Sequence, residues 1–143
     1  MGDLVVECSG RATPLSHAAA SSIVERVLRS EGIDRGRVDV VFHSVQRMRA
    51  LNRRTFGHDR ATDVIAFPLM HGSDFVGDLY VCPARARQQA RRFGVRVRDE
   101  LTRLLVHGAL HLAGHDHPEG ESRFDSNMWR LQERYVTAVR DVK

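Results

Sequence analysis

Apolar and polar residues follow two different periods along the chain, and the periods separate four predicted strands from five predicted helices. Short β-prone runs cover residues 4–8, 38–43, 62–67 and 75–82, and their lengths and compositions are typical of strands. The run at 62–67 is expected to stop at Pro68, because proline cannot donate a hydrogen bond to a sheet. The polar segment 71–74 separates the last two runs, so we expect these runs to form a hairpin.

The remaining segments carry apolar residues at the spacing of an amphipathic helix. Residues suited to helix ends bracket the first three of these segments: Ser16 and Gly32, Ser44 and Gly57, Pro83 and Gly94. A fourth helix is expected to begin near Asp99 and Glu100, whose negative charges suit a helix N-terminus. The fifth is predicted from one apolar stripe: Phe124, Met128, Leu131, Tyr135 and Ala138.

The order of these elements predicts an α+β fold, in which helices pack on a single mixed β-sheet. With 143 residues, 42% of them apolar, the chain is expected to form one domain spanning residues 1–143. It shows no apolar run of membrane-spanning length and no recognisable signal peptide. We therefore expect a cytoplasmic protein without a membrane partner, whose Cys8 and Cys82 are reduced core residues. The oligomeric state is left open.

Three histidines carry the clearest chemical signal in the chain: His107, His111 and His117. The first two are four residues apart, so they share one face of a helix. Gly114 can adopt the left-handed conformation that ends a helix, which allows the chain to bring His117 back to the same point. Three neutral imidazoles that converge leave a fourth position open, as catalytic zinc sites do. The spacing predicts a metal site at the end of a buried helix, holding one Zn²⁺ or another divalent ion.

The residue after the first histidine sets this motif apart from that of zinc peptidases. One class of those enzymes has the same spacing of three histidines and a glycine, with a glutamate beside the first histidine as general base. Here that position is Gly108. The spacing therefore still predicts a metal site, but it does not identify a general base.

Two residues beside the third histidine have two interpretations each. Asp116 either accepts a hydrogen bond from a ligand imidazole and orients it, or forms the turn before the last helix. His115 either supplements the metal site or is exposed to solvent.

Four blocks of the chain stand in an order that resembles a known family: Leu51–Asn52, Thr62–Pro68, Gly77–Leu79 and His107–His117. Together they resemble the YbeY family of bacterial endoribonucleases, the rRNA maturation factors. The resemblance implies a zinc-dependent, single-strand-specific endoribonuclease that acts in 16S rRNA 3′-end processing and in ribosome quality control. It also implies that the three histidines are metal ligands, and that rRNA and ribosomal particles are the partners.

The chain departs from the family pattern at one position close to the expected site. The family commonly has Tyr-Arg soon after Leu-Asn, and its arginine is a candidate for contacting substrate. The matching residues here are Thr55 and Phe56. Nearby basic residues that could take over this role are Arg54, His58 and Arg60, and we regard them as candidates for binding RNA.

The net charge of +4 is compatible with a nucleic-acid partner. Six arginines lie between residues 85 and 98, where they either bind phosphate or form a solvated helix face. Aromatic residues make up only 6% of the chain, so no aromatic-rich stacking surface of the kind that binds single strands is predicted.

Two other functions fit the same histidine motif. A non-catalytic ribosome-assembly factor would use the metal structurally, although structural zinc sites usually have four protein ligands. A metallopeptidase would need a general base other than residue 108. The four blocks favour the endoribonuclease over both alternatives.

Overall fold

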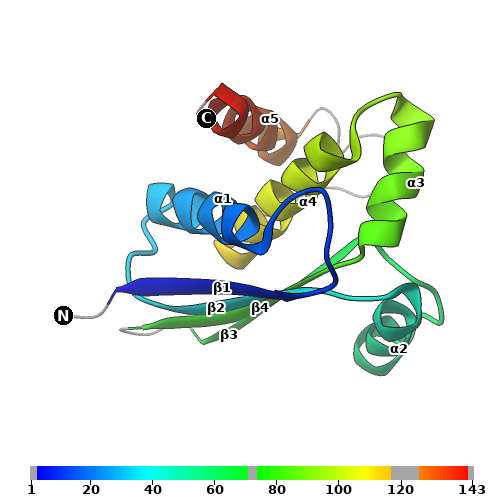
Figure 1. The fold of residues 1–143 in the computed structure, drawn as a ribbon. Coiled ribbons are helices and arrows are strands. Elements are labelled where there is room, and N and C mark those ends of the chain that lie inside the picture. Colours follow the sequence, from blue (N-terminus) through cyan, green and yellow to red (C-terminus); the bar gives the residue numbers. More distant parts are fainter. Residues whose placement is uncertain (1–2, 71–73, 117–125, 142–143) are drawn as a thin grey trace.

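The computed structural model describes residues 3–70, 74–116 and 126–141. Four strands and five helices follow one another along these residues, and Figure 1 shows how they are arranged. In chain order they are β1 (Leu4–Gly10), α1 (His17–Ser30), β2 (Gly36–Phe42), α2 (Val45–Phe56), β3 (Val64–Met70), β4 (Phe75–Val81), α3 (Pro83–Phe93), α4 (Val97–Leu112) and α5 (Asn127–Asp141). The predicted α+β fold is confirmed. Phe124, which the sequence placed in the apolar stripe of the last helix, lies outside the described residues.

The four strands form one mixed sheet in the order β1-β2-β4-β3. β2 is parallel to both β1 and β4, whereas β3 is antiparallel to β4. Parallel neighbours need a crossover connection, and α1 provides the one between β1 and β2. The antiparallel pairing of β3 with β4 confirms the predicted hairpin.

The prediction that Pro68 stops the third strand is wrong, because β3 continues to Met70. β3 lies at the edge of the sheet, and proline is tolerated in an edge strand, which has one side without a partner strand. The register with β4 shifts between Pro68 and Met70, an irregularity typical of such a position.

Helix starts follow the predicted caps. The Ser16 hydroxyl accepts a hydrogen bond from the Ala19 amide at 3.1 Å, and the Ser44 hydroxyl accepts one from the Arg47 amide at 3.2 Å. Each bond satisfies an amide that the first turn of a helix leaves without a partner. α4 begins at Val97, two residues before the predicted position.

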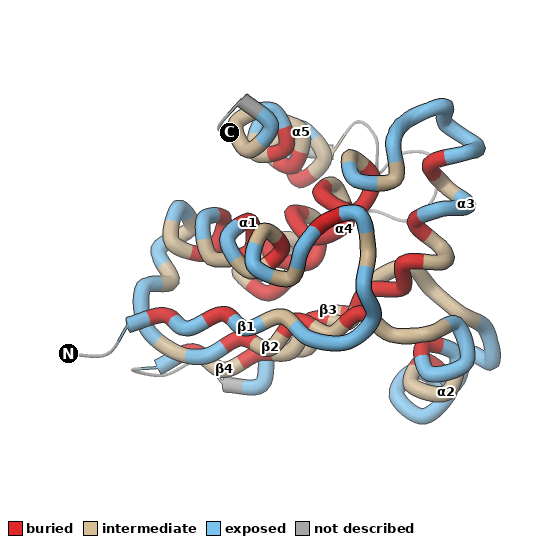
Figure 2. Tube along the Cα trace, viewed as in Figure 1, coloured by how far each residue is buried: buried red, intermediate tan, exposed pale blue. Residues whose placement is uncertain are grey.

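The main core lies between one face of the sheet and the helices α1 and α4 (Figure 1). α4 contacts α1, α3, α5, β3 and β4, and ten of its 16 residues are buried, as the red segments of Figure 2 show. A helix that is enclosed on most sides holds its remaining polar side chains in fixed positions. The predicted ligands on α4 therefore stand on a rigid support.

A smaller cluster lies against α2 and is formed by Met48, Ile65 and Cys82, with Phe67 and Tyr80 packed on it. Side chains alternate along β3 and β4, so this cluster lies on the sheet face opposite to α4. Both cysteines of the chain are free thiols; Cys82 is buried, and burial raises the pKa of the Cys8 thiol to about 11. None of the helices in the described ranges is both long enough and apolar enough to cross a bilayer.

Candidate metal centre and cleft

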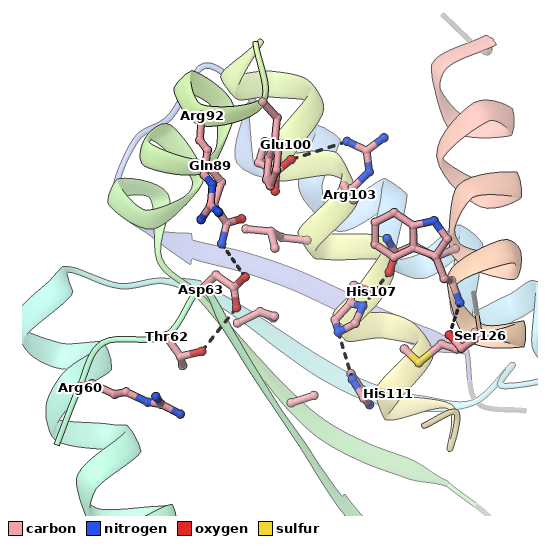
Figure 3. Close-up of a pocket in the computed structure, with 18 residues that line it drawn as sticks. Arg60, Thr62, Asp63, Gln89, Arg92, Glu100, Arg103, His107, His111 and Ser126 are labelled. Atoms are coloured by element: carbon pink, nitrogen blue, oxygen red, sulfur yellow. Dashed lines mark hydrogen bonds and ion pairs between the residues drawn. The ribbon is translucent and has the colours of Figure 1, made fainter. Parts of the chain in front are cut away.

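The C-terminal turns of α4 place two of the three predicted ligands side by side. His107 Nε2 and His111 Nε2 are 3.1 Å apart, and Figure 3 shows the two rings pointing toward each other. The four-residue spacing therefore places the two imidazoles together, as predicted. His117 lies outside the described residues, so its part in the site stays a prediction.

Gly114 ends α4 in the way that the sequence predicts. Its φ is 102°, a conformation that favours glycine. The Gly114 amide donates to the His111 carbonyl at 3.0 Å, and the His115 amide donates to the Leu110 carbonyl at 3.0 Å. This pair of bonds is the Schellman arrangement of a helix C-terminus. It turns the chain so that the carbonyl of residue 115 lies beside the ring of His111.

The Nδ1 atoms of both histidines are bonded to oxygen atoms. His111 Nδ1 lies 3.0 Å from the His115 carbonyl oxygen, and His107 Nδ1 lies 2.6 Å from Gln132 Oε1. The Gln132 amide nitrogen donates to Glu133, which identifies Oε1 as the acceptor. Because these oxygens only accept, they favour a hydrogen on each Nδ1 atom, and a neutral ring in this tautomer has its lone pair on Nε2.

This arrangement suits a divalent cation. Two nitrogens bound to one tetrahedral zinc at about 2.0–2.1 Å are roughly 3.3 Å from each other, and the observed separation of the two Nε2 atoms is 3.1 Å. Two neutral imidazoles with their Nδ1–H groups held by oxygen atoms are also the ligand form that zinc prefers. The described ranges contain no group of three potential metal ligands, and His117, the third predicted ligand, falls outside them.

Gly108 faces the sheet. A Cβ atom at this position would lie 2.3 Å from Leu79 Cδ1 and 3.1 Å from Val64 Cγ2. Leu79 is fully buried, so it has little room to move away. The glutamate that peptidases carry beside the first histidine therefore has no space in this fold, which argues against the peptidase interpretation.

We expect Gly108→Ala to lower the free energy of unfolding. Overpacking a core costs about 1–3 kcal/mol, which exceeds the gain of about 1 kcal/mol that alanine brings to a helix interior. Urea unfolding followed by circular dichroism measures the difference. An increase in stability, as expected for glycine at an exposed helix position, would contradict the packing seen here.

Two cavities meet at His111. The larger has a volume of about 790 Å³ and extends between α3, α4 and α5, as Figure 3 shows. The smaller has a volume of about 440 Å³ and lies near the C-terminal ends of α2 and α4. Both are lined by Thr62, Val64, Ala66 and His111. The two cavities thus form a cleft along the edge strand β3, with the histidine pair in its middle.

The larger cavity carries charges of both signs. Arg60 and Arg92 line it, together with the buried Glu100. Burial raises the pKa of Glu100 above its ordinary value, against the opposing effect of the Arg103 guanidinium. Arg103 itself forms two hydrogen bonds with Glu133, at 2.9 and 2.8 Å. Arg103 is thus held by an ion pair. Arg60 and Arg92, which line the same cavity, form no ion pair with other residues of the described ranges.

The structure separates the predicted RNA-binding candidates. Arg60 lines the larger cavity, and its carbonyl accepts a hydrogen bond from the buried Asn52 at 2.9 Å, which fixes the backbone there. Arg54 and His58 are exposed and line neither cavity. Among the six arginines between residues 85 and 98, Arg92 lines the larger cavity.

The two residues next to the third histidine lie near the smaller cavity. Asp116 is exposed and lines this cavity together with His111; its predicted role as an orienting acceptor stays a prediction. His115 Nε2 is 2.5 Å from Glu31 Oε1, and the Tyr135 hydroxyl donates to Glu31 Oε2 at 2.5 Å. Glu31 thereby ties the turn after α4 to α1 and α5, and this turn carries the carbonyl that holds His111.

The protonation of this network follows from its contacts. Burial tends to raise the pKa of Glu31, but hydrogen bonds from Tyr135 and His115 outweigh it, and the pKa is lowered. Burial and the Glu31 carboxylate raise the pKa of Tyr135 to about 12. Glu31 is therefore ionised and Tyr135 neutral at physiological pH.

Sequence reasoning missed the two groups that orient the histidines. Gln132 is 1% exposed and lies 25 positions from His107, so no local motif connects them. The available signal was a polar residue four positions after Met128, within the buried stripe of the last helix. The His115 carbonyl belongs to the backbone and leaves no trace in the sequence.

Comparison with known proteins connects this geometry to a family. The family model for Endoribonuclease YbeY matches residues 8–140. Endoribonuclease YbeY of Thermotoga maritima is 39% identical over 116 residues, which cover 81% of this chain and 75% of that protein. Its counterpart in Chlorobaculum parvum is 32% identical over 126 residues, which cover 88% of each chain.

A solved structure shares the fold as well. The solution structure of a Thermotoga maritima protein superposes with a TM-score of 0.68 at 32% sequence identity, covering 95% of this chain and 89% of that one. The resemblance seen in the four sequence blocks is thus confirmed over nearly the whole chain. By the extent of these matches, the chain is a member of the YbeY endoribonuclease family.

Proposed function

We propose that this chain is a zinc-dependent endoribonuclease that cleaves single-stranded RNA during 16S rRNA 3′-end maturation. Its relatives bear the name endoribonuclease. The observation that carries the proposal is the pair of imidazoles with Nε2 atoms 3.1 Å apart, at the meeting point of two cavities. A metal at this point would face a cleft, as a catalytic ion must.

Some residues of the site would bind the metal ion, and others would bind the RNA. His107 and His111 would bind zinc through Nε2, joined by His117 as the predicted third ligand. The Gln132 side chain and the His115 carbonyl keep the two rings in position by accepting their Nδ1–H groups. When bound, zinc supplies Lewis-acid chemistry toward a phosphodiester.

Arg60 and Arg92 give the larger cavity its affinity for the RNA backbone. Both line the wall of this cavity, and guanidinium groups bind phosphate oxygens in a bidentate manner. A cavity of about 790 Å³ is of the size that encloses a small ligand. It accepts individual nucleotides of a flexible strand, which supports the choice of single-stranded RNA over duplex RNA.

The same proposal extends to the setting of the reaction. We infer that the substrate is rRNA within ribosomal particles, that the enzyme acts in the cytoplasm and that it takes part in ribosome quality control. The support for this extension is the resemblance to the rRNA maturation factors in the four sequence blocks.

A cleavage assay tests the proposed function. The zinc-loaded protein is incubated with a labelled RNA that carries the 16S rRNA 3′ region, either single-stranded or annealed to its complement. We expect cleavage of the single strand, loss of cleavage with a chelator and recovery when zinc is added back. Equal cleavage of the duplex would contradict the strand preference.

Two further measurements separate the alternatives. Zinc-dependent cleavage of a peptide library would support the peptidase. Binding to ribosomal particles that persists with a chelator, together with no RNA cleavage under any metal condition, would support the non-catalytic assembly factor.

A further inference from the structure

The smaller cavity has an aromatic wall that the proposed function does not yet use. Phe56, the last residue of α2, lines it, and this residue is 52% exposed. An exposed ring in the wall of a cavity that also contains His111 is accessible to a bound ligand. This is also the position where the family pattern leads one to expect arginine.

The ring of Phe56 is held in place from behind. It stacks on Phe67, with ring centroids 6.2 Å apart and planes inclined by 5°. Phe67 in turn meets Tyr80 edge-on, with centroids 5.9 Å apart, and both pack on the cluster below α2. α2 ends at once after Phe56, because Gly57 adopts a left-handed φ of 75°. The outer face of the Phe56 ring is therefore presented by a fixed support.

The surroundings of this ring match the parts of a nucleotide. Pro68 adds a second apolar group to the cavity wall, and Asn52, Thr62 and Asp116 give the same wall a polar part. An aromatic face beside polar groups is a combination that binds unpaired bases of single strands.

The position of the cavity relates this base to the reaction. His111 lines both cavities, so a strand that passes the histidine pair occupies the larger cavity on one side and the smaller on the other. Resting on the proposed function, we propose that the smaller cavity is a nucleobase subsite in which Phe56 stacks on an unpaired base next to the scissile phosphate. A single stacking ring of this kind does not require the aromatic-rich surface that the composition argues against.

The subsite predicts a specific change in kinetics. Loss of one stacked base weakens single-strand binding by about 5- to 150-fold. The contact lies away from the reacting atoms, so Phe56→Ala is expected to raise KM by this factor and to leave kcat nearly unchanged. Phe56→Trp is expected to keep or lower KM. Phe56→Leu preserves apolar contact with Phe67 but removes the aromatic face, so it is expected to behave like the alanine variant.

A coupling experiment identifies the base. Substrates with one abasic nucleotide on either side of the cleaved bond are assayed with wild-type protein and with Phe56→Ala. We expect the abasic nucleotide on one side to raise KM for the wild type and to add nothing for the variant. Phe93→Ala is the matched control, because Phe93 is 59% exposed but lines the larger cavity, and it should not couple to the same nucleotide. Leu69→Ala is a second control, because Leu69 is 57% exposed, much like Phe56, but lines neither cavity.

The outcomes distinguish this inference from the function on which it rests. An unchanged KM for Phe56→Ala and Phe56→Leu, with normal cleavage by the wild type, would overturn the subsite and leave the endoribonuclease standing. Additive effects of Phe56→Ala and both abasic substrates would overturn it as well. Failure of the wild-type protein to cleave RNA with any metal would overturn both.

Discussion

Replacing His111 by alanine is expected to lower the rate of RNA cleavage by about 10³-fold or more. His111 is one of two imidazoles whose Nε2 atoms meet at 3.1 Å, and its removal leaves one described ligand. A metal ion contributes several kcal/mol to stabilising a hydrolytic transition state, and each loss of about 1.4 kcal/mol lowers a rate tenfold. The measurement is kcat with saturating single-stranded RNA, together with the zinc content per chain.

Stability provides the control for this experiment. Alanine is a good helix former and His111 is only partly buried, so the variant should fold. His17→Ala is a matched variant, because His17 lies at the start of α1, bonds to the Arg11 carbonyl and lines neither cavity. We expect it to cleave like the wild type. If His111→Ala kept its zinc and its rate to within about tenfold, the candidate metal centre would be in the wrong place.

Replacing Gln132 by leucine is expected to weaken zinc binding by about 10- to 100-fold, the usual effect of losing the group that orients a metal-binding histidine. The amide oxygen of Gln132 accepts from His107 Nδ1 at 2.6 Å, and Gln132 is 1% exposed. Leucine has a similar volume and no acceptor, so the ring of His107 loses its fixed orientation. The Nδ1–H group of the partly buried His107 also loses its acceptor, which costs up to about 3 kcal/mol of stability.

Two further variants show whether orientation is the cause. Gln132→Glu restores an oxygen acceptor at the same place, and we expect it to recover most of the zinc affinity. Gln88→Leu changes an exposed glutamine that bonds to Arg85 on α3, and it should have no effect. Competition with a chromophoric chelator gives the affinities. Equal affinity for the wild type and Gln132→Leu would show that the Gln132 contact does not position the ligand.

The features that sequence reasoning predicted correctly are local ones. The pairing of His107 with His111 follows from helix periodicity, and the turn at Gly114 follows from the freedom of glycine at positive φ. Helix starts at Ser16 and Ser44 follow from hydroxyl groups that bond to amides three residues away. Each of these interactions joins residues within one or two turns of the chain, so the order of residues is enough to predict it.

The features that it missed depend on which elements become neighbours. The prediction that Pro68 ends a strand is wrong because β3 lies at the edge of the sheet, and only the strand order shows this. The role of Gly108 could not be recognised until Leu79 of β4 was seen beneath it. The stack of Phe56 on Phe67 joins the end of α2 to β3, and a low aromatic content gives no indication of it.

By itself, the sequence determined the α+β order of elements, the histidine pair and the family. Helix periodicity, turn chemistry and residue order are properties of neighbouring residues, and packing does not alter them here. Only the tertiary structure decided what surrounds the histidines: the Gln132 side chain on His107 Nδ1, and the two cavities that meet at His111. These features join α4 to α5 and to β3, and their distances are set by the packing of the core.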